Sequence, residues 1–342
     1  MKALKWTATI LIVLVLLYLS GPHPSHLDLD KIPAVVLPTI PLTELEQNIQ
    51  QQERHTEDLK ANNQAQIIWV DSLHKKKTPY AIVYLHGFSA SQAEGHPVHR
   101  NIAKRYGCNL FLSRLYAHGL QEKEPLLSLT AEKLIVSAKE AIAIGKQLGD
   151  QVILMSTSTG GTLSLLLAGS DPDIAGLILY SPNINLYDSK SFLLTQPWGL
   201  QLARTVIGSD YYTFQAPAAA EQYWNTKYRI EALIELKRML NASMHQHTFQ
   251  AVKQPVFLGY YYKDETHQDD VVSIPSLLEM YDQLGTSELL KRKVAFPQAG
   301  FHVIASSYWT TNTSAVEKET ACFLEQIMKL TPIHTPTTCP SL

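Results

Sequence analysis

The 342-residue sequence contains few cysteines, few charged residues and almost no net charge. A formal net charge of −2 provides no basic surface, so we expect no nucleic-acid partner. Three cysteines, Cys108, Cys322 and Cys339, are too few and too scattered for a disulfide framework or a zinc site. The apolar stretches around Cys108 and Cys322 favour buried free thiols, whereas Cys339 is available to pair. No histidine or acid cluster has metal-ligand spacing, so neither a metal nor a cofactor is expected.

Long hydrophobic runs are also scarce, and the longest extends from Trp6 to Leu19, after Lys2 and Lys5. At about 1.5 Å per residue, this run is somewhat short for a hydrocarbon core of about 30 Å. Basic residues before a short apolar run are typical of a secretory signal. We therefore expect residues 1–21 to be a retained N-terminal membrane anchor or a cleaved signal peptide, with a buried core helix as the remaining alternative. The protein would then be membrane-anchored and extracytoplasmic, or secreted.

Residues 22–65 are first punctuated by proline and then rich in glutamate and glutamine, which predicts a linker and an exposed helix over 42–59. Strand and helix patterns alternate from there to about residue 331. The expected strands are 66–71, 80–85, 109–113, 152–155, 174–180, 255–261 and 293–296; the expected helices are 131–148, 273–284 and 314–330. This alternation predicts an α/β fold with a mostly parallel central sheet flanked by helices.

The segment 183–251 is much longer than a crossover between parallel strands requires. It is rich in aromatic residues and leucine, so we expect a helical cap inserted into an α/β core of residues 66–182 and 252–331. Residues 332–342 form a tail. Cap aromatics such as Trp198 and Trp224 are candidates for contact with an apolar substrate.

The stretch most typical of catalysis is residues 151–169, QVILMSTSTGGTLSLLLAG. An apolar strand here becomes an apolar helix within a few small residues, which is typical of a nucleophile elbow. Such a turn needs small residues two places before and after the nucleophile. Ser158 has Ser156 and Gly160 there, whereas Leu154 would stand two places before Ser156 and clash. Ser158 is therefore the expected nucleophile.

A serine nucleophile needs a base, and the base needs an acid that orients it. His302 follows the last expected strand, directly after Gly300 and Phe301, and is the expected base. The acid should follow the preceding strand, and two loop lengths compete there. We favour Asp269, which precedes an apolar pair and the next helix; Asp264 and Asp270 remain alternatives.

Two backbone N–H groups are expected to form an oxyanion hole. Thr159 N–H begins the helix after the elbow, and Phe88 N–H follows the strand that ends in His86-Gly87. A glycine at position 87 allows the backbone to approach a substrate closely.

Together these segments resemble the α/β-hydrolase fold and, within it, the carboxylesterase and monoacylglycerol lipase branch, which also includes serine aminopeptidase-like enzymes. The matching segments are YLHGFSAS at 84–91, RLYAHG at 114–119, VILMSTSTGG at 152–161, DDVVSIP at 269–275 and AGFHVI at 299–304. The chain departs from the family pattern at Ser156, where the elbow motif has glycine, and in a lengthened acid loop. The resemblance implies hydrolysis of an acyl or lipid-like apolar ester through an acyl-enzyme.

Two other functions remain open from the sequence. An exported peptidase or amidase of the same fold would use the same Ser-Asp-His set. A membrane-tethered binding protein without catalytic activity is the third alternative, although its site should have lost a member of that set. No obligate protein partner is indicated; the expected partners are a small-molecule ester or lipid and, through the N-terminal segment, a membrane.

Overall fold

A computed structural model describes residues 2–333 and 337–339. Residue 1 of the predicted N-terminal segment and residues 334–336 and 340–342 of the predicted tail lie outside the described residues.

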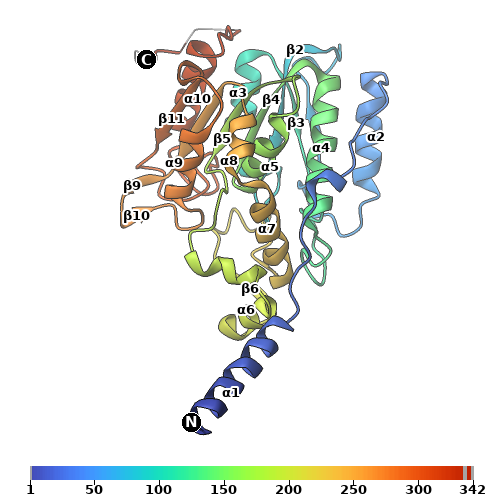
Figure 1. Cartoon of the computed structure of the whole chain (residues 1–342). Helices are drawn as coiled ribbons and strands as arrows, with labels where there is room; N and C mark the ends of the chain where they lie inside the picture. Colours follow the sequence, from blue (N-terminus) through green and yellow to red (C-terminus); the bar gives the residue numbers. More distant parts are fainter. Residues whose placement is uncertain (1, 334–336, 340–342) are drawn as a thin grey trace.

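Seven strands form the central sheet, in the order β1-β3-β2-β4-β5-β8-β11 (Figure 1). Their bounds are β1 Gln66–Ile68, β2 Thr78–Leu85, β3 Asn109–Leu112, β4 Gly149–Thr157, β5 Ile174–Tyr180, β8 Val256–Tyr260 and β11 Lys291–Ala295. Only β1 is antiparallel to its neighbour in this sheet. The predicted α/β class with a mostly parallel sheet is confirmed.

Side chains of the central strands alternate between two buried faces, as the period of a strand requires. On β2, Ile82 and Tyr84 pack on one face, and Val83 and Leu85 pack on the other. The first face is covered by α3 (Val98–Tyr106) and α10 (Thr313–Gln326). The second is covered by α4 (Ala131–Leu148), α5 (Thr159–Ala168), α8 (Gln246–Ala251) and α9 (Ile274–Gln283).

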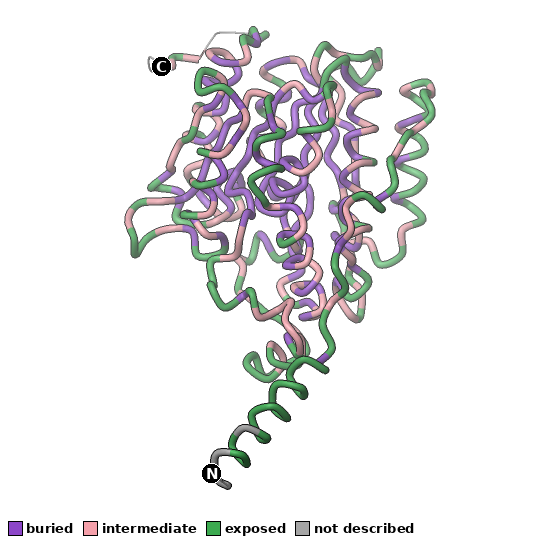
Figure 2. The backbone as a smooth tube through the Cα atoms, viewed as in Figure 1, coloured by how far each residue is buried: buried purple, intermediate pink, exposed green. Residues whose placement is uncertain are grey.

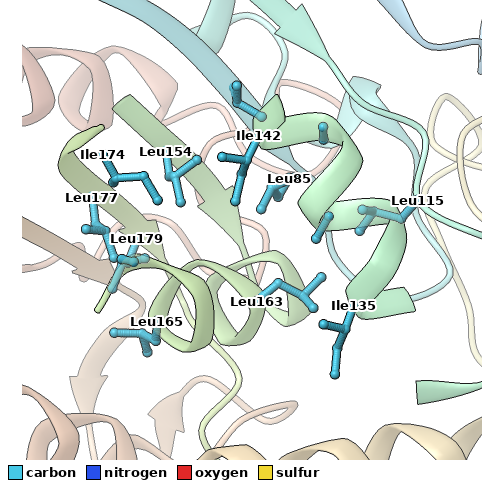
Figure 3. Packing of buried hydrophobic residues seen from close by; sticks show 14 of the residues in the cluster. Leu85, Leu115, Ile135, Ile142, Leu154, Leu163, Leu165, Ile174, Leu177 and Leu179 are labelled. Carbon is cyan, nitrogen blue, oxygen red and sulfur yellow. The ribbon is translucent and has the colours of Figure 1, made fainter. Parts of the chain in front are cut away.

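The cluster on the second face fixes the elbow helix α5 against the sheet. Leu163 and Leu165 of α5 pack among Leu85, Leu154 and Leu177 of the strands (Figure 3). Burial of each such side chain contributes about 1.5–3 kcal/mol. The helix that follows Ser158 is therefore held rigidly over the ends of β2, β4 and β5.

The chain between β5 and α8 forms a separate layer near the carboxyl ends of the strands. Its elements are η3 (Ser189–Thr195), α6 (Gly199–Ile207), β6 (Tyr211–Thr213), β7 (Lys227–Arg229) and α7 (Ile230–Ser243). The short strands β6 and β7 pair with each other and not with the central sheet. Single 3-10 turns elsewhere are η1 (Leu29–Lys31), η2 (Gln92–Gly95) and η4 (Glu288–Leu290).

The N-terminal helix α1 (Lys2–Leu19) projects from the body of the molecule beside α6 (Figure 1). It is exposed where its burial is described, whereas purple, buried chain fills the centre of the molecule (Figure 2). The predicted membrane anchor finds no support: within the described residues, no helix is long and apolar enough to cross a bilayer.

Helix α2 (Leu42–Arg54) ends five residues before the predicted boundary and is not fully exposed. Leu45, Ile49 and Glu53 are buried on one side of it. Glu53 tolerates burial because Arg114 donates to it from 2.7 Å.

The secondary structure differs from the prediction in three further places. The last helix, predicted over 314–330, begins at Thr313 and ends at Gln326, four residues before the predicted end. Helix α3 was not predicted, and neither was the hairpin of β9 (Tyr262–Asp264) and β10 (His267–Gln268).

The cysteines also differ from expectation. Cys108 is free and buried, as predicted. Cys322 is not a free thiol, because it forms a disulfide with Cys339 across a Cα–Cα distance of 5.5 Å. The partner comes from the tail, whose path the sequence pattern does not specify.

Candidate active site

Ser158 lies at the apex of the turn from β4 into α5, in a backbone conformation that non-glycine residues rarely adopt. Its φ and ψ are 53° and −117°. Four backbone hydrogen bonds fix this residue. Its N–H donates to Tyr180 O at 3.0 Å, and its carbonyl accepts from the N–H groups of Gly161 at 2.8 Å, Asn183 at 2.9 Å and Thr162 at 3.3 Å. A strained residue held by its surroundings in this way is typical of a functional turn.

The residues around Ser158 must be small for steric reasons. A Cβ on Gly160 would lie 1.9 Å from Leu85 O, so α5 could not approach β2 as closely with any other residue. Ser156 is fully buried, and its Oγ accepts a hydrogen bond from Ser164 Oγ at 3.0 Å. A serine therefore fits where the common motif has glycine.

His302 follows β11 and is paired with Asp269. Its Nδ1 donates to Asp269 Oδ2 at 2.6 Å. The other carboxylate oxygen accepts from the backbone N–H groups of Val271 at 2.9 Å and Val272 at 3.0 Å. Asp269 is completely buried, so these three donors fix the direction in which it faces His302.

The alternative acids lie elsewhere. Asp264 is in the β9–β10 hairpin, where it accepts hydrogen bonds from Thr266 and His267. These contacts hold the pKa of Asp264 well below its usual value. Asp270 is exposed. The structure thus brings Asp269, and not Asp264, to His302.

Burial would lower the pKa of His302, but the adjacent charge and hydrogen bond of Asp269 outweigh it, and the pKa lies above the usual value. Glu94 and Asp270 act in the same direction. His302 Nε2 is buried and has no hydrogen-bond partner among the described residues. This nitrogen is the one that would accept a proton, because Nδ1 is engaged by Asp269.

The two predicted oxyanion donors lie at the ends of β2 and β4. His86 Nδ1 donates to Gly87 O at 2.9 Å, and its Nε2 accepts from Leu115 N–H at 3.0 Å. Burial lowers the pKa of His86 far below its usual value, so the ring is neutral and this arrangement is fixed. In a trans peptide, N–H points away from the C=O. The bond to Gly87 O therefore turns Phe88 N–H away from His86.

One acid near Ser158 was not predicted from the sequence. Glu94, in η2, is 2% exposed, and its Oε2 accepts a hydrogen bond from Gly87 N–H. Glu94 stands eight positions after His86, among small residues, and belongs to no sequence motif. The available signal was a charged residue in a loop otherwise free of charge.

The two candidate aromatic contacts have different surroundings. Trp224 is 4% exposed and packs with Ala90 and Val303, next to His302. Trp198 instead contacts the N-terminal segment, where its Nε1 donates to Leu17 O at 3.1 Å. Phe88 packs against Tyr228 of β7 with ring centroids 5.4 Å apart. The chain around 214–228 therefore covers the predicted oxyanion loop and the loop of His302.

Sequence comparison finds limited similarity. No family model matches the chain. A stretch of 108 residues, 32% of the chain, is 29% identical to a thermostable monoacylglycerol lipase of Bacillus sp. (strain H-257). The match spans 42% of the length of that curated relative.

Structural similarity extends over most of the chain. A structure described with the metagenome-derived lipolytic enzymes LipS and LipT matches with a TM-score of 0.62 at 15% identity, covering 78% of this chain and 99% of that one. DcsB, solved in complex with its substrate analogue, matches with a TM-score of 0.54 at 15% identity over 79% of this chain and 98% of that one. A putative non-heme bromoperoxidase, BpoC of Mycobacterium tuberculosis H37Rv, matches with a TM-score of 0.50 at 13% identity, covering 81% and 99%. The sheet order, the elbow after β4 and these similarities show that the chain has the α/β-hydrolase fold.

Proposed function

We propose that the chain hydrolyses carboxylic esters, with Ser158 as nucleophile, His302 as general base and Asp269 as the acid that orients the base. The observation that carries this proposal is how the two nitrogens of the His302 ring are placed. Its Nδ1 is held 2.6 Å from a buried carboxylate, while its Nε2 is left without a partner among the described residues. This arrangement fixes the tautomer that can accept a proton from a serine.

In the first step, Ser158 Oγ attacks the ester carbonyl as its proton moves to His302 Nε2. The oxygen of the tetrahedral intermediate becomes negative. Phe88 N–H and Thr159 N–H would donate hydrogen bonds to this oxygen. Both are free to do so, because neither has a hydrogen-bond partner among the described residues. Collapse of the intermediate expels the alcohol, which takes the proton from His302, and leaves an acyl group on Ser158.

In the second step, water attacks the acyl-enzyme. His302 Nε2 takes a proton from the water and returns it to Ser158 Oγ as the carboxylic acid leaves. Asp269 stabilises the imidazolium in both steps and keeps Nδ1 as the donor.

An apolar acyl or lipid-like ester is the substrate class that the surroundings favour. Phe88, Tyr228 and Phe214 form one apolar group beside the predicted oxyanion loop, and Trp224, Val303 and Trp309 form another beside His302. Apolar walls with a few convergent polar groups are typical of ligand sites. The name of the curated relative, a monoacylglycerol lipase, is consistent with this class.

The proposal extends to an extracytoplasmic location. The Cys322–Cys339 disulfide supports it, because such bonds persist mainly in oxidising compartments. N-terminal sequencing of the mature protein and fractionation of producing cells test whether residues 1–21 are retained and where the protein resides.

A fluorophosphonate probe and a panel of p-nitrophenyl esters of increasing acyl length test the activity, with p-nitroanilides included to detect amidase activity. We expect the probe to label Ser158, and Ser158→Ala to abolish labelling and lower kcat by at least about 10⁴-fold. Peptide mapping identifies the labelled serine, and Ser170→Ala, an exposed position, serves as the control. Esterase activity that persists in Ser158→Ala contradicts the assignment.

A further inference from the structure

Glu94 is a buried carboxyl group beside the nucleophile, and the steps proposed above do not use it. Its Oε1 and the Cβ of Ser158 lie 2.7 Å and 3.0 Å from the position that a Cβ on Gly87 would occupy. Its Oε2 accepts from Gly87 N–H, and Oε1 has no hydrogen-bond partner among the described residues. A buried acid is costly unless it is paired or protonated, so its presence here needs an explanation.

Hydrogen bonds in and around η2 hold Glu94 in place. Ser91 caps η2 by accepting from Ala93 N–H, and Glu94 N–H donates to Ser91 O at 3.1 Å. Just after η2, His96 O accepts from Ser307 N–H at 2.8 Å. This last bond ties the loop of Glu94 to the loop that carries His302.

Tyr84 and His99, the titratable groups close to Glu94, are both neutral, so His302 is the group that can interact with Glu94 as a charge. Tyr84 Oη lies 3.4 Å from Glu94 Oε2, but burial raises the pKa of this phenol far above its usual value, so it is neutral. His99, which packs edge-on against the Tyr84 ring, is neutral because burial lowers its pKa to about 3. No lysine or arginine among the described residues pairs with Glu94.

We propose that Glu94 is a positioning residue of this active site, which anchors the oxyanion loop through Gly87 N–H and places a second negative charge near His302. Its first role acts on geometry. Glu94 holds the N–H of Gly87 while His86 holds the carbonyl, so both sides of that residue are fixed before Phe88 N–H meets a substrate.

The second role acts on the proton affinity of His302, which Asp269 and the exposed Asp270 also influence. Burial raises the pKa of Glu94 to about 7, so its carboxyl group carries a negative charge in part of the molecules at neutral pH. An ionised Glu94 favours imidazolium over imidazole. Removing its charge therefore lowers the pKa of His302, and the base becomes competent at a lower pH.

The experiment is an NMR titration of the His302 ring in the full chain, in parallel with the pH dependence of kcat/KM for a p-nitrophenyl ester. Glu94→Gln keeps the shape of the side chain and an acceptor for Gly87 N–H but removes the charge. We expect the pKa of His302 to fall by about 1. The acid limb of the pH profile of kcat/KM should move to lower pH by the same amount. Glu57→Gln removes an exposed acid after α2 and is the matched control, in which both values stay as in the wild type.

Two further variants separate the roles. Glu94→Ala leaves Gly87 N–H without its acceptor, so we expect kcat to fall about 10-fold or more below that of Glu94→Gln. Glu94→Asp keeps the charge but is one methylene shorter, so kcat falls while the acid limb stays near its wild-type pH. Glu94→Asp also provides the comparison if Glu94→Gln does not fold.

The proposal rests on the proposed function, but the titration does not need turnover. An unchanged His302 pKa in folded Glu94→Gln, or an acid limb that moves in Glu94→Asp as it does in Glu94→Gln, overturns the role of Glu94. A His302 pKa that falls in Glu94→Gln supports that role even if the wild type neither binds fluorophosphonate nor hydrolyses esters, a result that would instead refute the proposed function.

Discussion

At the scale of single residues, the His302–Asp269 contact has the sharpest consequence. Asp269→Asn replaces the acceptor of the Nδ1 proton with a group that can donate, which favours the wrong imidazole tautomer. We expect kcat to fall by about 10⁴-fold. Steady-state kinetics on a short p-nitrophenyl ester measure the loss.

Asp264→Asn is the matched control for this prediction. Asp264 is half-buried and contacts its own hairpin, so its replacement should leave kcat within about twofold of the wild-type value. Equal losses in the two variants would contradict the choice of Asp269.

Not every residue of the candidate site can be predicted from the sequence. Chain order and position after strands indicate Ser158 and His302, because these features follow from the topology of a parallel sheet. Glu94 is different. It reaches Gly87 only because η2 folds the chain back, and no spacing rule in the sequence encodes that return.

At the scale of elements, the approach of α5 to β2 sets the geometry of the elbow. Gly160→Ala places a Cβ 1.9 Å from Leu85 O, a backbone atom that cannot move without shifting β2. Overpacking of this kind costs about 3 kcal/mol or more. We expect a lower free energy of unfolding, measured in urea, and a loss of about 10²-fold or more in kcat.

Gly208→Ala is the control for Gly160→Ala. Gly208 has a φ of +72° and open space around it, so alanine there costs only the backbone preference, about 1–2 kcal/mol. A Gly160→Ala protein as stable as Gly208→Ala would show that α5 does not need its close contact with β2.

The elements differ in how well the sequence specifies them. Helix α4 has the predicted bounds, Ala131–Leu148. A long apolar periodicity, a Thr130 cap and a following glycine all indicate the same helix with the same ends. No comparable set of signals indicates the β9–β10 hairpin, since its strands are short and largely polar. This hairpin lengthens the loop before Asp269, which is why the sequence alone left two loop lengths, and Asp264 and Asp270 as alternatives, open for the acid.

At the scale of the whole molecule, the tail is bound back onto α10. Thr337 N–H donates to Glu325 at 2.9 Å, and two residues later Cys339 is bonded to Cys322. The disulfide closes a loop with a sequence separation of 17 residues. Closing a loop of about this length restricts the unfolded chain by about 3 kcal/mol in the chain-entropy account.

Cys339→Ser should therefore lower the free energy of unfolding by up to about 3 kcal/mol and leave kcat unchanged, because α10 covers the sheet face opposite α5. Thermal unfolding with and without a reductant measures the effect. Reduction should bring the wild type to the stability of Cys339→Ser and should not change Cys339→Ser itself, since the two cysteines that remain there, Cys108 and Cys322, are both buried and Cys322 has lost its disulfide partner. A wild type whose Tm does not respond to reduction would show that the tail adds no stability through this bond, and the disulfide would then lend no support to an extracytoplasmic location.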